Sequence, residues 1–334
     1  MTDAPHAYCT YFDSGYLSRG LTLIESLRAH GDHSPVWVMA LDEATAAYLK
    51  DAAIPGVHVM TVADLEQSID ALAPLKSQRS RMEYYFTTTP LLIRWVMAQY
   101  ADTATSVIYL DSDLYFFDDP QAVLDAMGDG SVGIIEHRYQ PRLAKRLAKY
   151  GRFNVGWVGF RADARGKACL DWWGDRTLEW CRDVPDSGRY ADQGYLDQFP
   201  TLFEGVAILE SPGLNLAPWN TARHRIEGSG DRVTVDGSPL VFFHFHGLKR
   251  TTSWWVSSQL VYGARMGAAL RNLVYVPYIR HLERMNAIVA ASPLIPHTSV
   301  AARGAGLRGL LFRAQRAALT SLSVVTRAAV RAND

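Results

Sequence analysis

An apolar, β-branched segment that stops at two carboxylates is the feature that most constrains the fold of this 334-residue chain. Val107 to Leu110 is followed at once by Asp111-Ser112-Asp113. Such a segment is typical of a buried strand in an α/β sheet, and these sheets bind ligands beyond the carboxyl ends of their strands. We therefore expect Asp111 and Asp113 at a ligand crevice, where carboxylate oxygens suit Mg²⁺ or Mn²⁺. Without further support, two solvated acids at a strand end are the commoner interpretation of such a pair.

The N-terminal part of the chain alternates between strand and helix patterns. Residues 7–12, 36–41 and 57–62 have the composition of strands. Between them, apolar residues recur at helical spacing from Leu17 to Leu27, and residues 43–51 also favour a helix. This order predicts an α/β fold, a parallel sheet with helices on both faces.

Later segments extend the pattern. Pro90 is expected to be the first residue of a helix that runs to Gln99 and leads into the Asp111 strand. Further strands are expected at residues 132–135, 154–161, 202–209 and 240–245, the last two closing the sheet, with helices at residues 143–149 and 168–181.

The C-terminal segment differs in charge, and we divide the chain into a main domain, residues 1–283, and a basic helical tail, residues 284–334. No acidic residue occurs between Arg284 and Asn333. On a helix, the tail arginines and the apolar residues fall on different sides. The arginines on one side are Arg308, Arg313, Arg316, Arg327 and Arg331, the apolar residues on another are Leu307, Leu311, Leu322 and Val325, and Arg303 adds a sixth arginine to the tail. Such a helix could lie peripherally on an anionic membrane surface. The alternatives are a helix packed on the main domain with a solvated arginine face, or a disordered tail.

The composition of the chain indicates which partners it binds and in which cellular compartment it works. The formal net charge is zero, which argues against nucleic-acid binding over the whole surface. The three cysteines form no Cys-x-x-Cys pair and no disulfide framework, so a reducing compartment is expected. We see no secretory signal and no apolar run of about 18 residues. We therefore expect a cytoplasmic protein, with the tail as its candidate contact with the inner face of the membrane.

Several polar residues elsewhere could join the Asp pair. His244 ends an apolar strand and could be a third metal ligand, while Gly247 lets backbone approach a phosphate and Lys249 can neutralise it. His244 and His246 should lie on opposite faces of the strand, so that at most one faces the site. Each residue also has a structural interpretation, since a lone histidine is more often a core residue.

Amide and carboxylate side chains form a second group of candidates. Asp192-Gln193 could bind sugar hydroxyls or stabilise a developing cation, although Asp is also favoured at a helix N-cap. Asn154 could present its amide to a sugar, or belong to a turn before a strand. Asn215 and Asn220 offer two further amides, beside an indole face.

These segments, in this order, resemble the family 8 glycosyltransferases, which are retaining enzymes of the GT-A fold that include glycogenin and bacterial lipopolysaccharide galactosyltransferases. Asp111-Ser112-Asp113 is similar to the metal-binding Asp-x-Asp of the family. The other matching segments are Thr10 to Leu27, Arg94 with its spacing to Asp111, Phe153-Asn154-Val155-Gly156, Asp192-Gln193-Gly194-Tyr195-Leu196, and His244-Phe245-His246-Gly247. The resemblance covers roughly residues 7 to 255. It departs at Asp13, where the family has Asn-Asp, and at Lys249, which follows Gly247 by two residues rather than three.

The resemblance implies a mixed, mostly parallel sheet, a nucleotide-diphosphate sugar donor, most often UDP-linked, and a glycan or glycolipid acceptor. Mn²⁺ or Mg²⁺ would be held by Asp111, Asp113 and His244. Thr10, Asp13, Arg94, Asn154, Asn220, Gly247 and Lys249 would bind substrate. Asp192 would stabilise the oxocarbenium-like transition state or act as nucleophile, with Gln193 beside it.

Two other functions stay open at this point. Haloacid-dehalogenase-like phosphatases also use Asp-x-Asp after a strand, with the first Asp as nucleophile; here Tyr115 stands where they usually have Thr or Val. A GT-A-like domain that binds nucleotide or glycan without turnover is the third interpretation. The basic segment from Glu136 to Lys149 could meet an anionic acceptor, or be a solvated helix face.

Overall fold

The computed structural model describes residues 6–100, 105–229, 232–296 and 320–332. Its first half is built by strands that alternate with helices. The strands β1 His6–Phe12, β2 Val36–Ala40, β3 Val57–Thr61 and β4 Ser106–Leu110 are parallel, in the order β3-β2-β1-β4. The helices between them are α1 Leu17–Ala29, α2 Glu43–Ala52, α3 Val62–Ser68 and α4 Arg81–Gln99.

The second half of the chain extends this sheet and makes it mixed. β7, Phe153–Arg161, runs antiparallel to both β4 and β6, Val132–Glu136. β8, Val206–Ile208, is parallel to β6 and forms the edge, which gives the order β3-β2-β1-β4-β7-β6-β8. This mostly parallel seven-stranded sheet confirms the predicted fold class.

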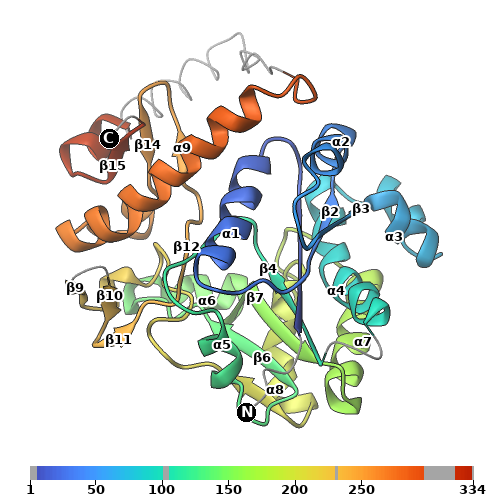
Figure 1. The fold of residues 1–334 in the computed structure, drawn as a ribbon. Coiled ribbons are helices and arrows are strands. Elements are labelled where there is room, and N and C mark those ends of the chain that lie inside the picture. Colours follow the sequence, from blue (N-terminus) through green and yellow to red (C-terminus); the bar gives the residue numbers. More distant parts are fainter. Residues whose placement is uncertain (1–5, 101–104, 230–231, 297–319, 333–334) are drawn as a thin grey trace, which may run out of the picture.

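Two apolar cores lie on the two faces of the sheet. The helices that cover them are labelled in Figure 1. One face is covered by α3, α4 and α7 Ala164–Glu179, around residues such as Leu92 and Trp173. The other face is covered by α1, α2, α5 Gln121–Ala126 and α9 Val276–Ala290, and α1 packs beside α9. Because both faces are buried, the central strands are mostly apolar, and the exceptions within β1 and β7 include Thr10 and Asn154.

The helix expected to begin at Pro90 begins nine residues earlier in the structure, at Arg81, and Pro90 lies inside it. The start is fixed by a capping box: the Ser80 hydroxyl accepts from the backbone of Glu83, and the Glu83 carboxylate accepts from the backbone N–H of Ser80. The sequence-based start was therefore wrong, because Pro at a first helical position is only one of its common places. The longer helix carries Thr89 to the site described below.

Two other boundaries also differ from expectation. α7 begins at Ala164 rather than Ala168, because the Asp163 carboxylate accepts from the backbone N–H of Gly166 and caps the helix. The strand expected over residues 202–209 is shorter, since α8, Phe199–Leu202, occupies the segment before β8.

The strand expected at residues 240–245 does not close the main sheet. β12, Phe242–His244, instead pairs antiparallel with β5, Leu114–Phe116, in a separate two-stranded sheet. The register places His244 opposite Leu114, the residue after Asp113. This pairing therefore brings His244 to the Asp pair.

The C-terminal part of the chain returns to the main body. β13 Lys249–Arg250, β14 Trp254–Val256 and β15 Ala329–Arg331 form a three-stranded sheet. The prediction of one helix through Arg327 and Arg331 was therefore wrong at its end: Arg327 has φ of 60°, and Arg331 lies in β15 with its guanidinium stacked over Trp254. Arg303, Arg308, Arg313 and Arg316 lie outside the described residues. The boundary between residues 283 and 284 falls within α9, and the division into two parts stays a prediction.

The remaining elements are short. They are α6 Ala144–Tyr150, β9 Ile226–Ser229, β10 Arg232–Val235 and β11 Ser238–Pro239, with single helical turns at Ala73–Ser77, Pro141–Leu143, Gln193–Gln198, Thr221–Arg223, Gln259–Tyr262 and Leu270–Tyr275. Within the described part of the chain, no helix combines the length and the apolar character needed to cross a membrane.

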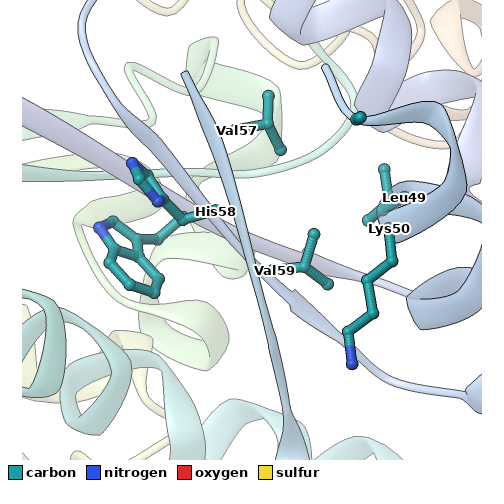
Figure 2. A pocket seen from close by; sticks show the side chains of 7 residues that line it. Leu49, Lys50, Val57, His58 and Val59 are labelled. Atoms are coloured by element: carbon teal, nitrogen blue, oxygen red, sulfur yellow. The ribbon is translucent and has the colours of Figure 1, made fainter. Parts of the chain in front are cut away.

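An open hollow of about 350 Å³ lies at the edge strand β3. Figure 2 shows Val57 and Val59 on the side of the strand that faces Leu49 and Lys50, whereas His58 points to the other side. None of the residues that line this hollow is a predicted site residue. Two strands, β2 and β1, lie between β3 and β4 in the sheet, so this hollow is distinct from the site at the Asp pair.

Candidate active site

Asp111, Asp113 and His244 converge where β4 ends and β5 pairs with β12. His244 Nε2 lies 3.0 Å from Asp113 Oδ1 and 3.6 Å from Asp111 Oδ2. The backbone N–H of Asp111 donates to Gly156 O at 2.8 Å, which ties the carboxylates to β7. The expected trio is thus assembled from separate stretches of sequence.

The electrostatics of this trio favour a cation. Burial raises the pKa of Asp111, and the charge of Asp113 adds to this effect while His244 opposes it. Burial would also raise the pKa of Asp113, but the charge and hydrogen bond of His244 outweigh it and lower this pKa to about 2. Burial would lower the pKa of His244, and the two carboxylates outweigh it and raise that pKa. The two carboxylates therefore stabilise a positive charge placed between them and His244, and a site for a divalent cation needs this property.

His246 also lies at the site, contrary to the expectation that only one of the two histidines would do so. One ligand atom from each of Asp113, His244 and His246 lies within 4.8 Å of the others. The alternation of a strand does not apply here, because β12 ends at His244 and the chain turns at Gly247, whose φ is 71°. His246 is exposed, whereas His244 is buried. Carboxylate oxygens suit Mn²⁺ and Mg²⁺, and imidazole nitrogens favour a transition metal.

Gly156 and Asn154 support the rear of the His244 ring. A Cβ on Gly156 would lie 2.7 Å from His244 Nδ1 and 2.7 Å from Asn154 Oδ1. Only glycine leaves room for both groups here. Asn154 Oδ1 accepts from the Gly156 N–H at 3.1 Å and lies 3.3 Å from His244 Nδ1.

The Asn154 side chain connects His244 with the second acidic segment. Its Nδ2 donates to Gln193 Oε1 at 3.2 Å, and Gln193 Nε2 donates to the backbone carbonyl of Tyr150 at 2.7 Å. Asn215 Nδ2 donates to Asn154 Oδ1 at 3.3 Å. The predicted residues Asn154 and Gln193 are therefore brought together beside His244.

Asp192 lies at the start of the turn Gln193–Gln198 and is 5% exposed. Burial raises its pKa to about 7; a hydrogen bond from Thr89 opposes the shift, and the charge of Asp111 adds to it. A chain of hydroxyl groups leads from Thr89 to Tyr11 at 3.3 Å, from Tyr11 to Tyr109, and from Tyr109 to Asp111 Oδ1 at 2.9 Å. Asp192 therefore belongs to the same buried polar group as Asp111.

The side-chain amide of Asn220 forms all of its hydrogen bonds with backbone groups. Its Oδ1 accepts from the N–H of Ala217 at 2.8 Å, and its Nδ2 donates to the carbonyls of His137 and Asn215 at 3.1 and 3.0 Å. The side chain is completely buried. These contacts give Asn220 the role of shaping the loop that carries Asn215.

Thr10 and Asp13 lie at the carboxyl end of β1. Thr10 is 1% exposed, and its hydroxyl has no hydrogen-bond partner among the described residues. Asp13 forms an ion pair with Arg81 at 3.1 Å and accepts from the Gly15 N–H.

The predicted cations lie in different surroundings. Arg94 faces α7, where its guanidinium lies 3.8 Å from Asp171 and 3.7 Å from Asp175, neither of which is a predicted site residue. Lys249 is exposed in β13, just after the turn at Gly247.

Arg19 is a cation of the site that the sequence did not indicate. Its Nη2 donates to Leu248 O at 2.8 Å, and its charge acts on Asp113. The same guanidinium lies 4.6 Å from the ring centre of Tyr16. No spacing in the sequence connects α1 with the turn after β12, so only the fold reveals this contact.

Comparison with known proteins places the chain among relatives of similar length. The uncharacterized protein YfnF of Bacillus subtilis strain 168 is 33% identical over 250 residues, which is 73% of this chain and 82% of that protein. The chain belongs to the YfnF family. The uncharacterized protein YfnD of the same organism is 29% identical over 279 residues, 83% of this chain and 88% of that protein. No family model matches the chain.

The YfnF-family chain also has the fold of a glycosyltransferase. The structure of an active-site mutant of the galactosyltransferase LgtC aligns with a TM-score of 0.50 at 16% identity. The alignment covers 87% of this chain and 98% of that one. The GT-A fold expected from the sequence is thereby confirmed, and the trio of Asp111, Asp113 and His244 in this YfnF-family member lies at the carboxyl end of its central strand β4.

Proposed function

We propose that the protein is a metal-dependent glycosyltransferase that moves a sugar from a nucleotide-diphosphate donor, UDP-linked, to a glycan or glycolipid acceptor. We place it with the retaining family 8 enzymes. The observation that supports this proposal is the convergence of Asp111, Asp113 and His244 in a GT-A fold. These residues come from two distant segments and meet only through the pairing of β5 with β12.

In this proposal, Asp111, Asp113 and His244 hold Mn²⁺ or Mg²⁺, and His246 is a further ligand. The donor set fits, because it combines two carboxylates with imidazole nitrogens in one cluster. When bound, the ion supplies Lewis-acid stabilisation of the nucleoside diphosphate as it leaves.

Cationic side chains of the protein would assist the same charge. Lys249 lies after the turn at Gly247, and Arg19 is held beside Asp113 through its bond to Leu248 O. Charge-assisted hydrogen bonds from these groups would strengthen as the diphosphate becomes free. The role of Arg94 as a donor clamp stays a prediction; its contacts with Asp171 and Asp175 support a position on the α4–α7 surface.

Asp192 and Gln193 would face the transferred sugar, with Asn154 orienting Gln193. The transition state at the anomeric carbon resembles an oxocarbenium ion, and a carboxylate beside it lowers its free energy. Thr10 and Asp13 would border the donor at the end of β1. Asn220 would shape the loop rather than touch substrate.

A donor screen tests this function. The protein with Mn²⁺ is incubated with UDP-, GDP-, ADP- and dTDP-sugars, and released nucleoside diphosphate is measured, with Asp113→Ala and the exposed-surface control Asp70→Asn beside it. We expect hydrolysis of one donor that requires metal, survives in the control and is lost in Asp113→Ala. If no sugar donor in the panel releases nucleoside diphosphate, and if no nucleotide raises the Tm of the protein, the proposal is contradicted. Phosphate release from a phosphomonoester would support the phosphatase alternative, and metal-dependent nucleotide binding without turnover the binding module.

We further propose that the arginines of the C-terminal tail contact an anionic membrane surface from the cytoplasmic side. The support is the absence of acidic residues between Arg284 and Asn333.

A further inference from the structure

A cationic helix lies near Asp111, Asp113 and His244, the proposed metal trio, and forms no ion pair within the described chain. Four basic residues, Arg142, Lys145, Arg146 and Lys149, occupy α6 and the turn before it. Within residues 6–100, 105–229, 232–296 and 320–332, none of the four forms an ion pair with a carboxylate. We call these four residues the α6 cations.

Two carboxylates near α6, those of Glu136 and Asp197, interact with residues other than the α6 cations. Glu136 forms an ion pair with Arg152, and the Asp197 carboxylate accepts from the backbone N–H groups of Arg152 at 2.8 Å and of Phe153 at 3.3 Å. The positive charge of the α6 cations is therefore left uncompensated by these two neighbours, and is free to act on a ligand.

Aromatic rings connect the α6 cations with the metal trio. The Arg146 guanidinium lies 4.7 Å from the ring centre of Tyr262, whose ring centre is 6.2 Å from that of His246. Lys149 Nζ donates one hydrogen bond to the Tyr150 hydroxyl at 3.0 Å and lies 4.6 Å from the centre of that ring, which leaves two of its N–H groups for a ligand. A cation stacked on a ring keeps its outer hydrogen-bond donors free, and a guanidinium can grip a carboxylate or phosphate with two of them.

The same helix is joined to the proposed sugar-binding side. Tyr150 ends α6, and its backbone carbonyl accepts from Gln193 Nε2 at 2.7 Å. The Tyr150 ring is half-buried and packs edge-on against Tyr190 at 5.0 Å. A partly open tyrosine ring beside fixed cations is a surface on which a sugar ring can stack.

We propose that the α6 cations and Tyr150 form the acceptor subsite and that the acceptor is an anionic glycan, a sugar chain that carries carboxylate or phosphate groups. This inference rests on the proposed glycosyltransferase function, and it names the acceptor class of that site. A neutral acceptor would gain nothing from four uncompensated cations, whereas an anionic one would be drawn to them and oriented toward Gln193 and His246.

Two matched pairs of tetrasaccharides test the proposal by calorimetric titration of the full chain with Mn²⁺ and UDP present. One pair is tetragalacturonate and its neutral methyl ester; the other is phosphorylated maltotetraose and maltotetraose. We expect the anionic member of at least one pair to bind about tenfold more tightly than its neutral partner, and this difference to shrink as salt is raised. Preference within the first pair identifies a carboxylate acceptor, and preference within the second a phosphate acceptor; either supports the proposal.

Variants locate the binding surface. Arg146→Ala combined with Lys149→Ala should abolish the preference, while Lys167→Ala, an exposed lysine of α7 at the opposite end of the sheet, should leave it unchanged. If loss of Arg146 disturbs packing on Tyr262, the exposed pair Lys145→Ala and Lys149→Ala carries the same expectation.

Equal binding of anionic and neutral sugars in both pairs overturns the proposal, and a preference that persists in both double variants overturns its location. Donor hydrolysis by the unaltered protein, measured in the same samples, reports on the proposed function separately. Its absence beside a clear anionic preference would remove the transferase function and leave a binding surface for anionic glycans.

Discussion

Asn154 Oδ1 lies 3.3 Å from His244 Nδ1, on the side of the imidazole ring away from Asp113. Two other donors, the Gly156 N–H and the Asn215 amide, also point at this oxygen. The oxygen can therefore only accept from the ring, so Nδ1 carries a proton and Nε2 faces the carboxylates. An outer hydrogen bond of this kind fixes the orientation of a metal-binding histidine and the nitrogen that it presents.

Gly156→Ala should weaken metal binding without unfolding the protein. The new Cβ would meet His244 Nδ1 and Asn154 Oδ1 at 2.7 Å, so the ring must shift. Forcing such a shift costs about 1–3 kcal/mol, and if the cost falls on the metal-bound position of the ring, Mn²⁺ affinity drops by about fivefold to 150-fold. Calorimetric titration with Mn²⁺ measures it.

Gly267→Ala is the matched control for this substitution, because nothing lies within 4 Å of a Cβ at that position. The control should bind Mn²⁺ as the unaltered protein does. Equal affinity of both alanine variants would show that the His244 position does not depend on Gly156.

Metal binding should stabilise the protein, and Asp113→Asn should remove this effect. At a concentration of Mn²⁺ one hundred times its Kd, a ligand that binds only the folded state contributes about 2.7 kcal/mol. For a chain of this size we expect a rise in Tm of about 5 °C, reversed by EDTA. Thermal unfolding with and without metal measures it. Asp70→Asn, on an exposed segment, should keep the full rise; a rise in Asp113→Asn as large as in that control would exclude Asp113 as a ligand.

His246→Gln should alter the metal site but spare the fold. His246 is exposed, and its ring packs loosely against Trp219 at 5.5 Å, so its loss costs little stability. If its imidazole binds the ion, the electron paramagnetic resonance signal of bound Mn²⁺ should lose one nitrogen coupling, and affinity should fall about tenfold. The substitution His58→Gln, at the edge strand β3, is the comparison. A spectrum identical to that of the unaltered protein would restrict the site to His244.

Asp192→Asn should stabilise the protein at alkaline pH. Burial raises the pKa of Asp192 to about 7 in the folded state, whereas the unfolded value is about 4. The folded protein therefore holds this proton more tightly than the unfolded one, so stability falls as pH rises from about 4 to about 7. Asn has no proton to lose, and the variant should be more stable above pH 7 by up to about 4 kcal/mol.

The gain from Asp192→Asn should shrink to about 0.5 kcal/mol near pH 4, where Asp192 is neutral in the folded state and about half ionised in the unfolded one. Denaturant unfolding at pH 4 and pH 8 measures the difference. A variant that is no more stable than the unaltered protein at pH 8 would mean that Asp192 is not strained by burial. Activity should fall in the same variant, since the carboxylate charge would be absent from the sugar side.

Replacing Arg303, Arg308, Arg313 and Arg316 by Gln should abolish sedimentation with vesicles that contain anionic lipid. Each arginine near such a surface contributes about 1 kcal/mol. Deleting the tail would be a poorer test, because it also removes β15, which pairs with β14. Binding that survives in the quadruple variant would place the membrane contact elsewhere or remove it.

The sequence predicted the parts of the site that end strands. Asp111 and Asp113 follow an apolar run, and His244 ends another, so local patterns were enough to name them. What the sequence could not supply was the partner of β12, because strand pairing depends on contacts between distant segments. The same limit explains Arg19 and His246, whose roles follow from a turn at Gly247 rather than from any periodic pattern.

The misplaced start of α4 has a different cause. Pro90 is a strong local signal, but the Ser80–Glu83 capping box is stronger, and its two hydrogen bonds fix the start of the helix. Arg94 was named from its spacing to Asp111 and faces α7 in the structure, since spacing along a helix does not determine which neighbour covers each face.

The strand β15 has a consequence for how the protein is made. It completes the small sheet that begins with Lys249, yet it is translated long after β14, with all of α9 in between. Because β15 pairs with β14, the small sheet that follows the turn of His246 and Gly247 lacks its outer strand while the chain is still emerging from the ribosome. Maturation of the site should lag behind formation of the seven-stranded sheet, and a nascent chain stalled before residue 329 should already be globular yet bind metal poorly.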